Sequence, residues 1–94
     1  MRYVRACFRA ASGEGYALAC EALAAADLRA LVPGIAAPTL VLCGSEELPA
    51  FRDAADWLQR TIKNAELALI SPARHASILQ QPAAFQRRVR AFLA

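Results

Sequence analysis

The sequence predicts an α/β fold in which two helices precede a strand, a helix, a second strand and a last helix, with the two strands parallel. Two short apolar runs, TLVLC at residues 39–43 and LALI at residues 67–70, are typical of strands that helices cover on both faces. Between these runs apolar side chains recur at helical spacing, at Phe51, Ala54, Ala55, Leu58 and Ile62. A helix that joins two such strands is the repeating unit of α/β proteins.

Length and composition indicate one small domain. The chain has 94 residues, 57% of them hydrophobic, and a domain of this size buries a smaller fraction of its surface than a larger one. No run of about eighteen apolar residues suggests a membrane span. The first residues, MRYVR, lack the apolar core of a secretion signal. We therefore expect a cytoplasmic protein with a thin core.

Two helices are expected over residues 1–31. The first shows an amphipathic pattern and ends near the sequence SGEG at residues 12–15. Ser12 can cap the second helix, and Glu14 lies in its first turn, where the helix dipole favours an anion. The sequence LVPG at residues 31–34 then interrupts the helical pattern.

The strand-helix-strand-helix unit is expected over residues 38–94. Pro38 and Gly44 bound the first apolar run, and Pro82 is well placed in the first turn of the closing helix. Two strands alone leave unpaired backbone groups along both edges of the sheet. We expect a partner chain or sequence from the amino-terminal side to complete the sheet.

The cysteines do not indicate a metal or redox site. Cys7, Cys20 and Cys43 are widely spaced and form no C-x-x-C pair, so we expect buried, reduced thiols and no metal or cofactor. Trp57 and the phenylalanines have helical spacing and are expected in the core.

The net charge of +3 comes mainly from arginine. Arg2, Arg5 and Arg9 would share one face of the first helix. Because no aromatic or glycine pattern accompanies them, a solvated helix face is favoured over a nucleic-acid site.

Chemistry concentrates where the two strands end. The sole histidine, His75, follows the second strand, and Glu46 and Glu47 follow the first. Open α/β sheets present functional loops at this edge. A carboxylate against an imidazole would fix its tautomer and stabilise the imidazolium. A histidine with a merely structural role is the alternative for His75 considered alone.

These positions resemble the α/β-hydrolases, whose triad follows the chain order nucleophile, acid, histidine. The acid of that family follows a buried strand as Gly-x-x-Asp, and Gly44 is followed three residues later by Glu47. The resemblance implies that Glu47 is the acid, with Glu46 as its substitute, and that His75 is the catalytic histidine.

Within this family the sequence is most similar to 3-oxoadipate enol-lactonases. The likeness is carried by GYALACEAL at residues 15–23, DLR at 27–29, IAAPTLVL at 35–42, HAS at 75–77 and QP at 81–82. It implies carboxylic ester or lactone hydrolysis, helices that leave the cap at residues 1–31, and the carboxy-terminal end of the core at residues 38–94. The sequence departs from the family pattern at residues 48–50 and 72–74, next to both site residues.

The nucleophile elbow, Gly-x-Ser-x-Gly, does not occur at any of the four serines, Ser12, Ser45, Ser71 and Ser77. We therefore expect a carboxy-terminal segment of a truncated or split hydrolase, inactive alone, whose partner is the missing amino-terminal hydrolase segment. The alternative is a non-catalytic, self-associating remnant that forms a homo-oligomer. Neither hypothesis requires a nucleic acid or a membrane.

Overall fold

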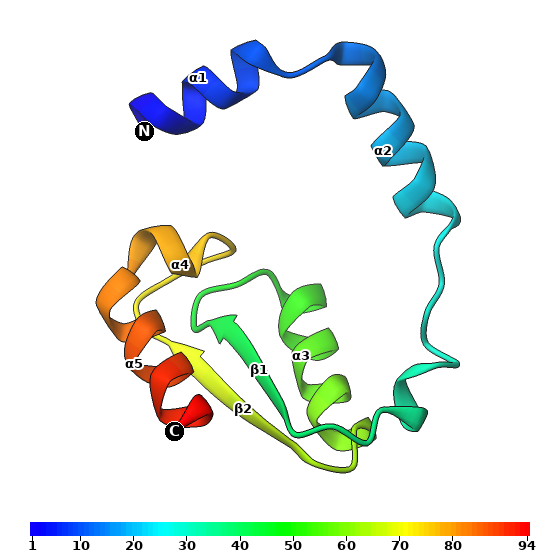
Figure 1. The fold of residues 1–94 in the computed structure, drawn as a ribbon, viewed down its shortest axis with the longest axis vertical. Helices are drawn as coiled ribbons and strands as arrows, with labels where there is room; N and C mark the ends of the chain where they lie inside the picture. The colour runs from blue at the N-terminus through cyan, green and yellow to red at the C-terminus, as the bar shows by residue number, and fades with distance from the viewer.

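The computed structural model describes residues 1–94 and has the predicted order of main elements (Figure 1). The elements are α1 (Arg2–Ala10), α2 (Gly13–Ala25), the short 3-10 helix η1 (Val32–Gly34), β1 (Thr39–Gly44), α3 (Pro49–Thr61), β2 (Ala65–Ile70), the short α4 (Ser77–Gln80) and α5 (Pro82–Leu93). The α/β prediction is confirmed. The short helices η1 and α4 were not predicted from the sequence.

The two strands pair in parallel, as the sequence predicts. The register runs from Thr39 opposite Ala65 to Gly44 opposite Ile70, so both strands end at the same edge of the sheet (Figure 1). The segments after these strands, residues 45–48 and 71–76, therefore lie side by side.

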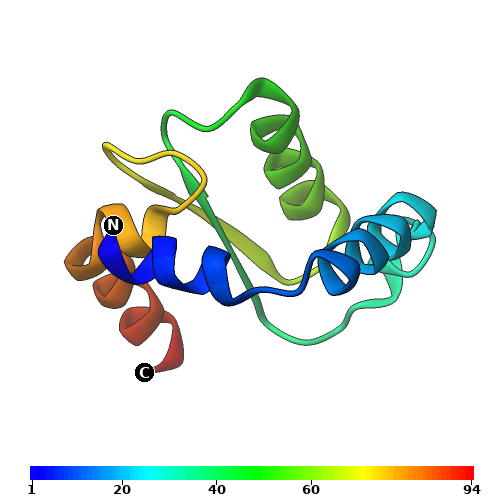
Figure 2. The same ribbon diagram turned by 90° about the horizontal axis from the view of Figure 1, so that it is seen from above.

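Helices flank the strand pair on two sides. Helix α3 packs against both strands and α5 packs against β2, and Figure 2 shows them on opposite sides of the pair. The central cluster consists of Val41, Cys43 and Ala55, with Leu58 and Leu67 packed against it. This cluster places the core between α3 and the sheet.

The strands are covered less completely than their apolar sequences predict. No residue of β1 is exposed, but in β2 Glu66 is exposed and Leu69 is 45% exposed. Leu69 lies opposite Cys43 in the register. It therefore belongs to the sheet face that α3 alone covers, and one helix does not cover that face fully.

The first two helices form an arm beside the rest of the chain (Figure 1). Ser12 caps α2, because its Oγ accepts a hydrogen bond from the backbone N–H of Gly15 at 3.1 Å. Neither α1 nor α2 contains a buried residue. The radius of gyration is 15.5 Å, whereas a compact domain of this length has about 12 Å. The arm thus adds little to the core.

Two sequence-based expectations about burial are wrong for the residues of the arm. Cys7 and Cys20 are exposed, and Phe8 is 72% exposed, because the arm that carries them packs against no sheet. Cys43 alone meets the expectation, and burial raises the pKa of its thiol. Phe51, in α3, is 48% exposed, whereas Trp57, Phe85 and Phe92 are partly buried. None of the helices combines the length and the apolar character needed to cross a bilayer.

Candidate acid and histidine site

Backbone hydrogen bonds join the two loops that follow β1 and β2. The N–H of Ser45 donates to the carbonyl of Ile70 at 2.9 Å, and the N–H of Glu46 donates to the carbonyl of Ala73 at 2.8 Å. These bonds extend the parallel ladder past the ends of the strands. They hold the residues that follow, Glu47 and His75, at the same edge of the sheet.

Gly44 permits this close approach of the loops. A Cβ atom at this position would lie less than 3.0 Å from the backbone carbonyl oxygens of Ala73 and Arg74. Both obstacles are backbone atoms, which cannot move aside as the end of a flexible side chain can. The glycine is therefore required by close packing of two chain segments.

The structure brings Glu47 and His75 into direct contact. His75 Nδ1 lies 2.8 Å from Glu47 Oε2. The second carboxylate oxygen, Oε1, accepts a hydrogen bond from the backbone N–H of Leu48 at 3.0 Å. The Glu47 side chain is only 7% exposed, whereas that of His75 is 74% exposed. The pair thus consists of a sheltered carboxylate and an open imidazole.

The surroundings of Glu47 favour its ionised form. Burial raises the pKa of Glu47. The hydrogen bonds from the Leu48 N–H and His75, together with the attraction of the imidazolium, lower it by more than burial raises it, so the pKa lies below its usual value of 4.5. An ionised carboxylate accepts hydrogen bonds but cannot donate them. The proton of the neutral imidazole therefore lies on Nδ1, and Nε2 remains free to accept a proton.

This lowered pKa predicts a pH-dependent stability. The folded chain holds the Glu47 carboxylate more strongly ionised than the unfolded chain, so its stabilising contribution is present above pH 4.5 and is lost as the pH falls through the folded-state pKa. Urea unfolding of the chain and of Glu47→Gln at pH 7 and pH 3 measures the effect. The free energy of unfolding should fall more with acid in the unchanged chain. An equal fall in both would contradict the prediction, and Glu66→Gln, at an exposed position in β2, is the control.

Glu46, the alternative acid, forms no hydrogen bond or ion pair with the imidazole. Its side chain is exposed and forms no ion pair or hydrogen bond, while its backbone N–H is used in the link between the loops. Both glutamates line a small hollow of about 260 Å³ with Leu48, Arg74 and His75. The geometry therefore favours Glu47 over Glu46 as the partner of His75.

Sequence reasoning did not anticipate the contacts that support the histidine loop. Gln80 Oε1 accepts a hydrogen bond from the backbone N–H of Arg74 at 2.7 Å, and Gln81 Nε2 donates to the carbonyl of Pro72 at 3.1 Å. The Phe51 ring lies against the imidazole, with 4.8 Å between centroids. The only sign of these contacts in the sequence was the pair Gln80 and Gln81 just before Pro82. The sequence did not show in which direction their amide groups point.

The structure contains no cluster of metal-ligating side chains. Nowhere do three or more histidine, cysteine, aspartate or glutamate side chains gather as metal ligands. Cys43 is buried in the core. The contact between the Glu47 carboxylate and the His75 imidazole forms a pair that can orient a base and accept a proton.

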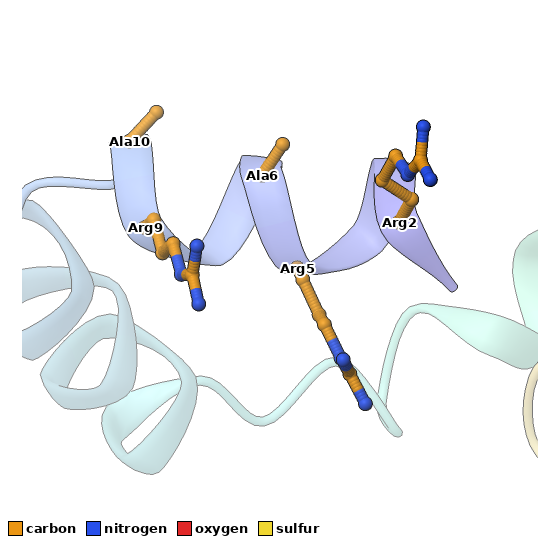
Figure 3. A pocket seen from close by; sticks show the side chains of 5 residues that line it. All are labelled: Arg2, Arg5, Ala6, Arg9 and Ala10. Carbon is orange, nitrogen blue, oxygen red and sulfur yellow. The ribbon is translucent and has the colours of Figure 1, made fainter.

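The largest hollow lies away from this pair, on α1. It measures about 650 Å³ and is lined only by residues of that helix: Arg2, Arg5, Ala6, Arg9 and Ala10. Figure 3 shows that the three guanidinium groups extend from successive turns without converging on one point. No second element closes this hollow, so we interpret it as an open helix face. The pair of Glu47 and His75 is therefore the better candidate for a functional site.

Comparison with known proteins identifies ester and lactone hydrolases as relatives. The chain is 37% identical over 82 residues to 3-oxoadipate enol-lactonase 2 of Acinetobacter baylyi. The matched segment covers 87% of the chain and 30% of that protein. It is 36% identical over 72 residues to 3-oxoadipate enol-lactonase 1 of the same organism, covering 77% of the chain and 27% of the relative. A pimeloyl-[acyl-carrier protein] methyl ester esterase of Nitrosospira multiformis is 32% identical over 59 residues, which are 63% of the chain and 22% of the esterase.

These relatives define the class: they are members of the α/β-hydrolase family, and the mixed α/β fold with two parallel strands is consistent with part of that fold. More particularly, the chain is similar to the carboxy-terminal portion of the 3-oxoadipate enol-lactonases. The chain spans about 30% of the length of the first of these relatives. No family model and no solved structure matches it.

Proposed function

We propose that these 94 residues supply the acid and the histidine of a hydrolytic triad that acts on a carboxylic ester or lactone. The nucleophilic serine comes from a segment outside these residues, since none of them forms a Gly-x-Ser-x-Gly elbow. The observation that carries the proposal is the 2.8 Å contact between His75 Nδ1 and Glu47 Oε2. It leaves Nε2 of this largely exposed side chain free to accept a proton.

In the proposed reaction His75 acts first as a base and then as an acid. Nε2 takes the proton of the serine hydroxyl as its oxygen attacks the substrate carbonyl, and the imidazolium then gives that proton to the departing alkoxide oxygen. Glu47 stays ionised throughout and stabilises the imidazolium through Nδ1–H. Water completes the cycle by the same steps and releases the acid. In a lactone the alcohol product remains attached to the acyl group until this hydrolysis frees the enzyme.

The substrate class is supported by the relatives. Two of them are named for hydrolysis of an enol-lactone and one for hydrolysis of a methyl ester. Lactones and methyl esters are both carboxylic esters. The shared chemistry favours a carboxylic ester or lactone, with an enol-lactone as the first substrate to test.

A chimera tests the proposal. The 82 matching residues replace their counterpart in the Acinetobacter enol-lactonase 2, and hydrolysis of the enol-lactone and of an aryl ester is measured. We expect turnover by the chimera, its loss in the chimera carrying His75→Ala, and no turnover by the 94-residue chain alone. A His75→Ala chimera that keeps full activity would disprove the role of His75. Circular dichroism of each chimera separates this result from a failure to fold.

The second candidate is a non-catalytic module that associates with copies of itself. Exposed apolar side chains on the arm support it, including Phe8, Tyr16, Leu18 and Leu23. The sheet has two strands, so both of its edges can accept a further strand. This candidate predicts a dimer or larger assembly in solution. Sedimentation of the chain at micromolar concentration is the test, and a monomer across the whole concentration range would eliminate it.

A further inference from the structure

The Phe51 ring is the second side chain that contacts the site imidazole. The ring centroids of Phe51 and His75 are 4.8 Å apart, and the planes are tilted by 54°. Aromatic rings attract each other at this separation and prefer tilted or offset arrangements. A phenyl ring also stabilises a neighbouring positive charge through its quadrupole, and His75 becomes positive whenever it holds a transferred proton.

Phe51 and Glu47 reach His75 from one short segment. Phe51 lies in the first turn of α3, where its backbone N–H donates to the carbonyl of Leu48 at 3.0 Å. Glu47 is attached to the same turn, because its Oε1 accepts from the Leu48 N–H. The backbone of residues 47–51 thus sets the carboxylate and the phenyl ring in a fixed relation.

The imidazole has few other restraints. Its side chain is 74% exposed, and the contact with Glu47 is its only hydrogen bond to another side chain. One hydrogen bond at Nδ1 fixes the position of that atom but leaves the ring free to tilt about it. The phenyl ring on one side of the imidazole restricts this tilt.

Phe51 contributes little to the core. It is 48% exposed and does not belong to the central cluster of Val41, Cys43 and Ala55. A large apolar side chain that remains this exposed while it contacts a histidine suggests a role toward the histidine. Its exposure also means that the chain should tolerate replacement of Phe51.

We propose that Phe51 is a positioning residue, which holds the His75 ring in the plane where Nδ1 donates to Glu47 and Nε2 is presented to the nucleophile. This inference rests on the proposed function and names a third participant in the same site. Phe51 touches neither a substrate nor a reacting atom in the proposal. Its effect passes through the orientation and tautomer of His75.

The test uses the 94-residue chain, in which His75 is the sole histidine and its ring nitrogens give unambiguous 15N NMR signals. At a pH where the ring is neutral, we expect mainly the Nδ1–H tautomer in the unchanged chain. Phe51→Leu should shift the imidazole toward a mixture of tautomers and remove the ring-current shift of the carbon-bound protons of His75. Phe51→Tyr keeps the ring and should retain both signatures. Phe8→Leu is the matched control, since Phe8 lies on the exposed face of α1.

The outcomes separate this inference from the proposed function. Glu47→Gln should remove the Nδ1–H preference whether or not Phe51 has a role. If Glu47→Gln removes the preference but Phe51→Leu changes neither signature, the positioning role is wrong and the proposed function stands. If the unchanged chain shows no Nδ1–H preference, the contact between Glu47 and His75 does not form and both fail. Unchanged backbone amide signals from β1 and β2 show that each variant is folded.

Discussion

Replacing Glu47 by glutamine in the enol-lactonase chimera is expected to lower kcat by about 10³ to 10⁴-fold, as loss of the orienting carboxylate does in serine hydrolases. The amide is nearly isosteric with the carboxylate but carries no charge to stabilise the imidazolium. Its NH₂ group can also donate to Nδ1, which would favour the tautomer with the proton on Nε2. That tautomer cannot accept the serine proton. The measurement is steady-state hydrolysis of the lactone, with KM expected to change much less than kcat.

Glu46→Gln is the matched control for this variant. It makes the same chemical change one residue earlier, at a side chain that is exposed and forms no hydrogen bond with His75. We expect kcat within about twofold of the unchanged chimera, because the exposed charge of Glu46 is screened by solvent and salt. A larger loss from Glu46→Gln than from Glu47→Gln would reverse the assignment of the acid.

The sequence was sufficient to predict the order of the main elements and the acid and histidine contact. Both rest on strong local signals: the apolar runs define the strands, and a helix between them makes them parallel. Parallel strands end at one edge of the sheet, which is why the residues after each strand could be expected to meet. The register that places Gly44 opposite Ile70 confirmed this reasoning.

Contacts that depend on side-chain direction could not be predicted. Phe51 fits the apolar stripe of α3, and nothing in the helical period indicates that its ring turns toward His75. Likewise, the period of α1 identifies its apolar face but not whether another element covers that face. Cys7 and Phe8 belong to a helix with no buried residue, so the expectation of burial was wrong although the helix was predicted.

Gly44→Ala is expected to lower the free energy of unfolding by about 3 kcal/mol, at the upper end of the usual cost of overpacking a tight site. The backbone at Gly44 does not have a positive φ, so alanine is allowed conformationally and the cost comes from the clash alone. The added methyl group meets the carbonyls of Ala73 and Arg74 and must push the histidine loop away from β1. Because His75 follows directly, its contact with Glu47 should weaken together with the stability.

Urea unfolding measures the loss, and the 15N signals of His75 report whether the Nδ1–H preference falls with it. Gly34→Ala is the control, since a Cβ atom there meets nothing within 4 Å, and its free energy of unfolding should change by no more than about 0.5 kcal/mol. Equal stability of the two variants would show that the loops can separate at no cost. The close approach at Gly44 would then not be what holds the acid against the histidine, and the hydrogen bonds from Ser45 and Glu46 to the histidine loop would have to carry that role by themselves.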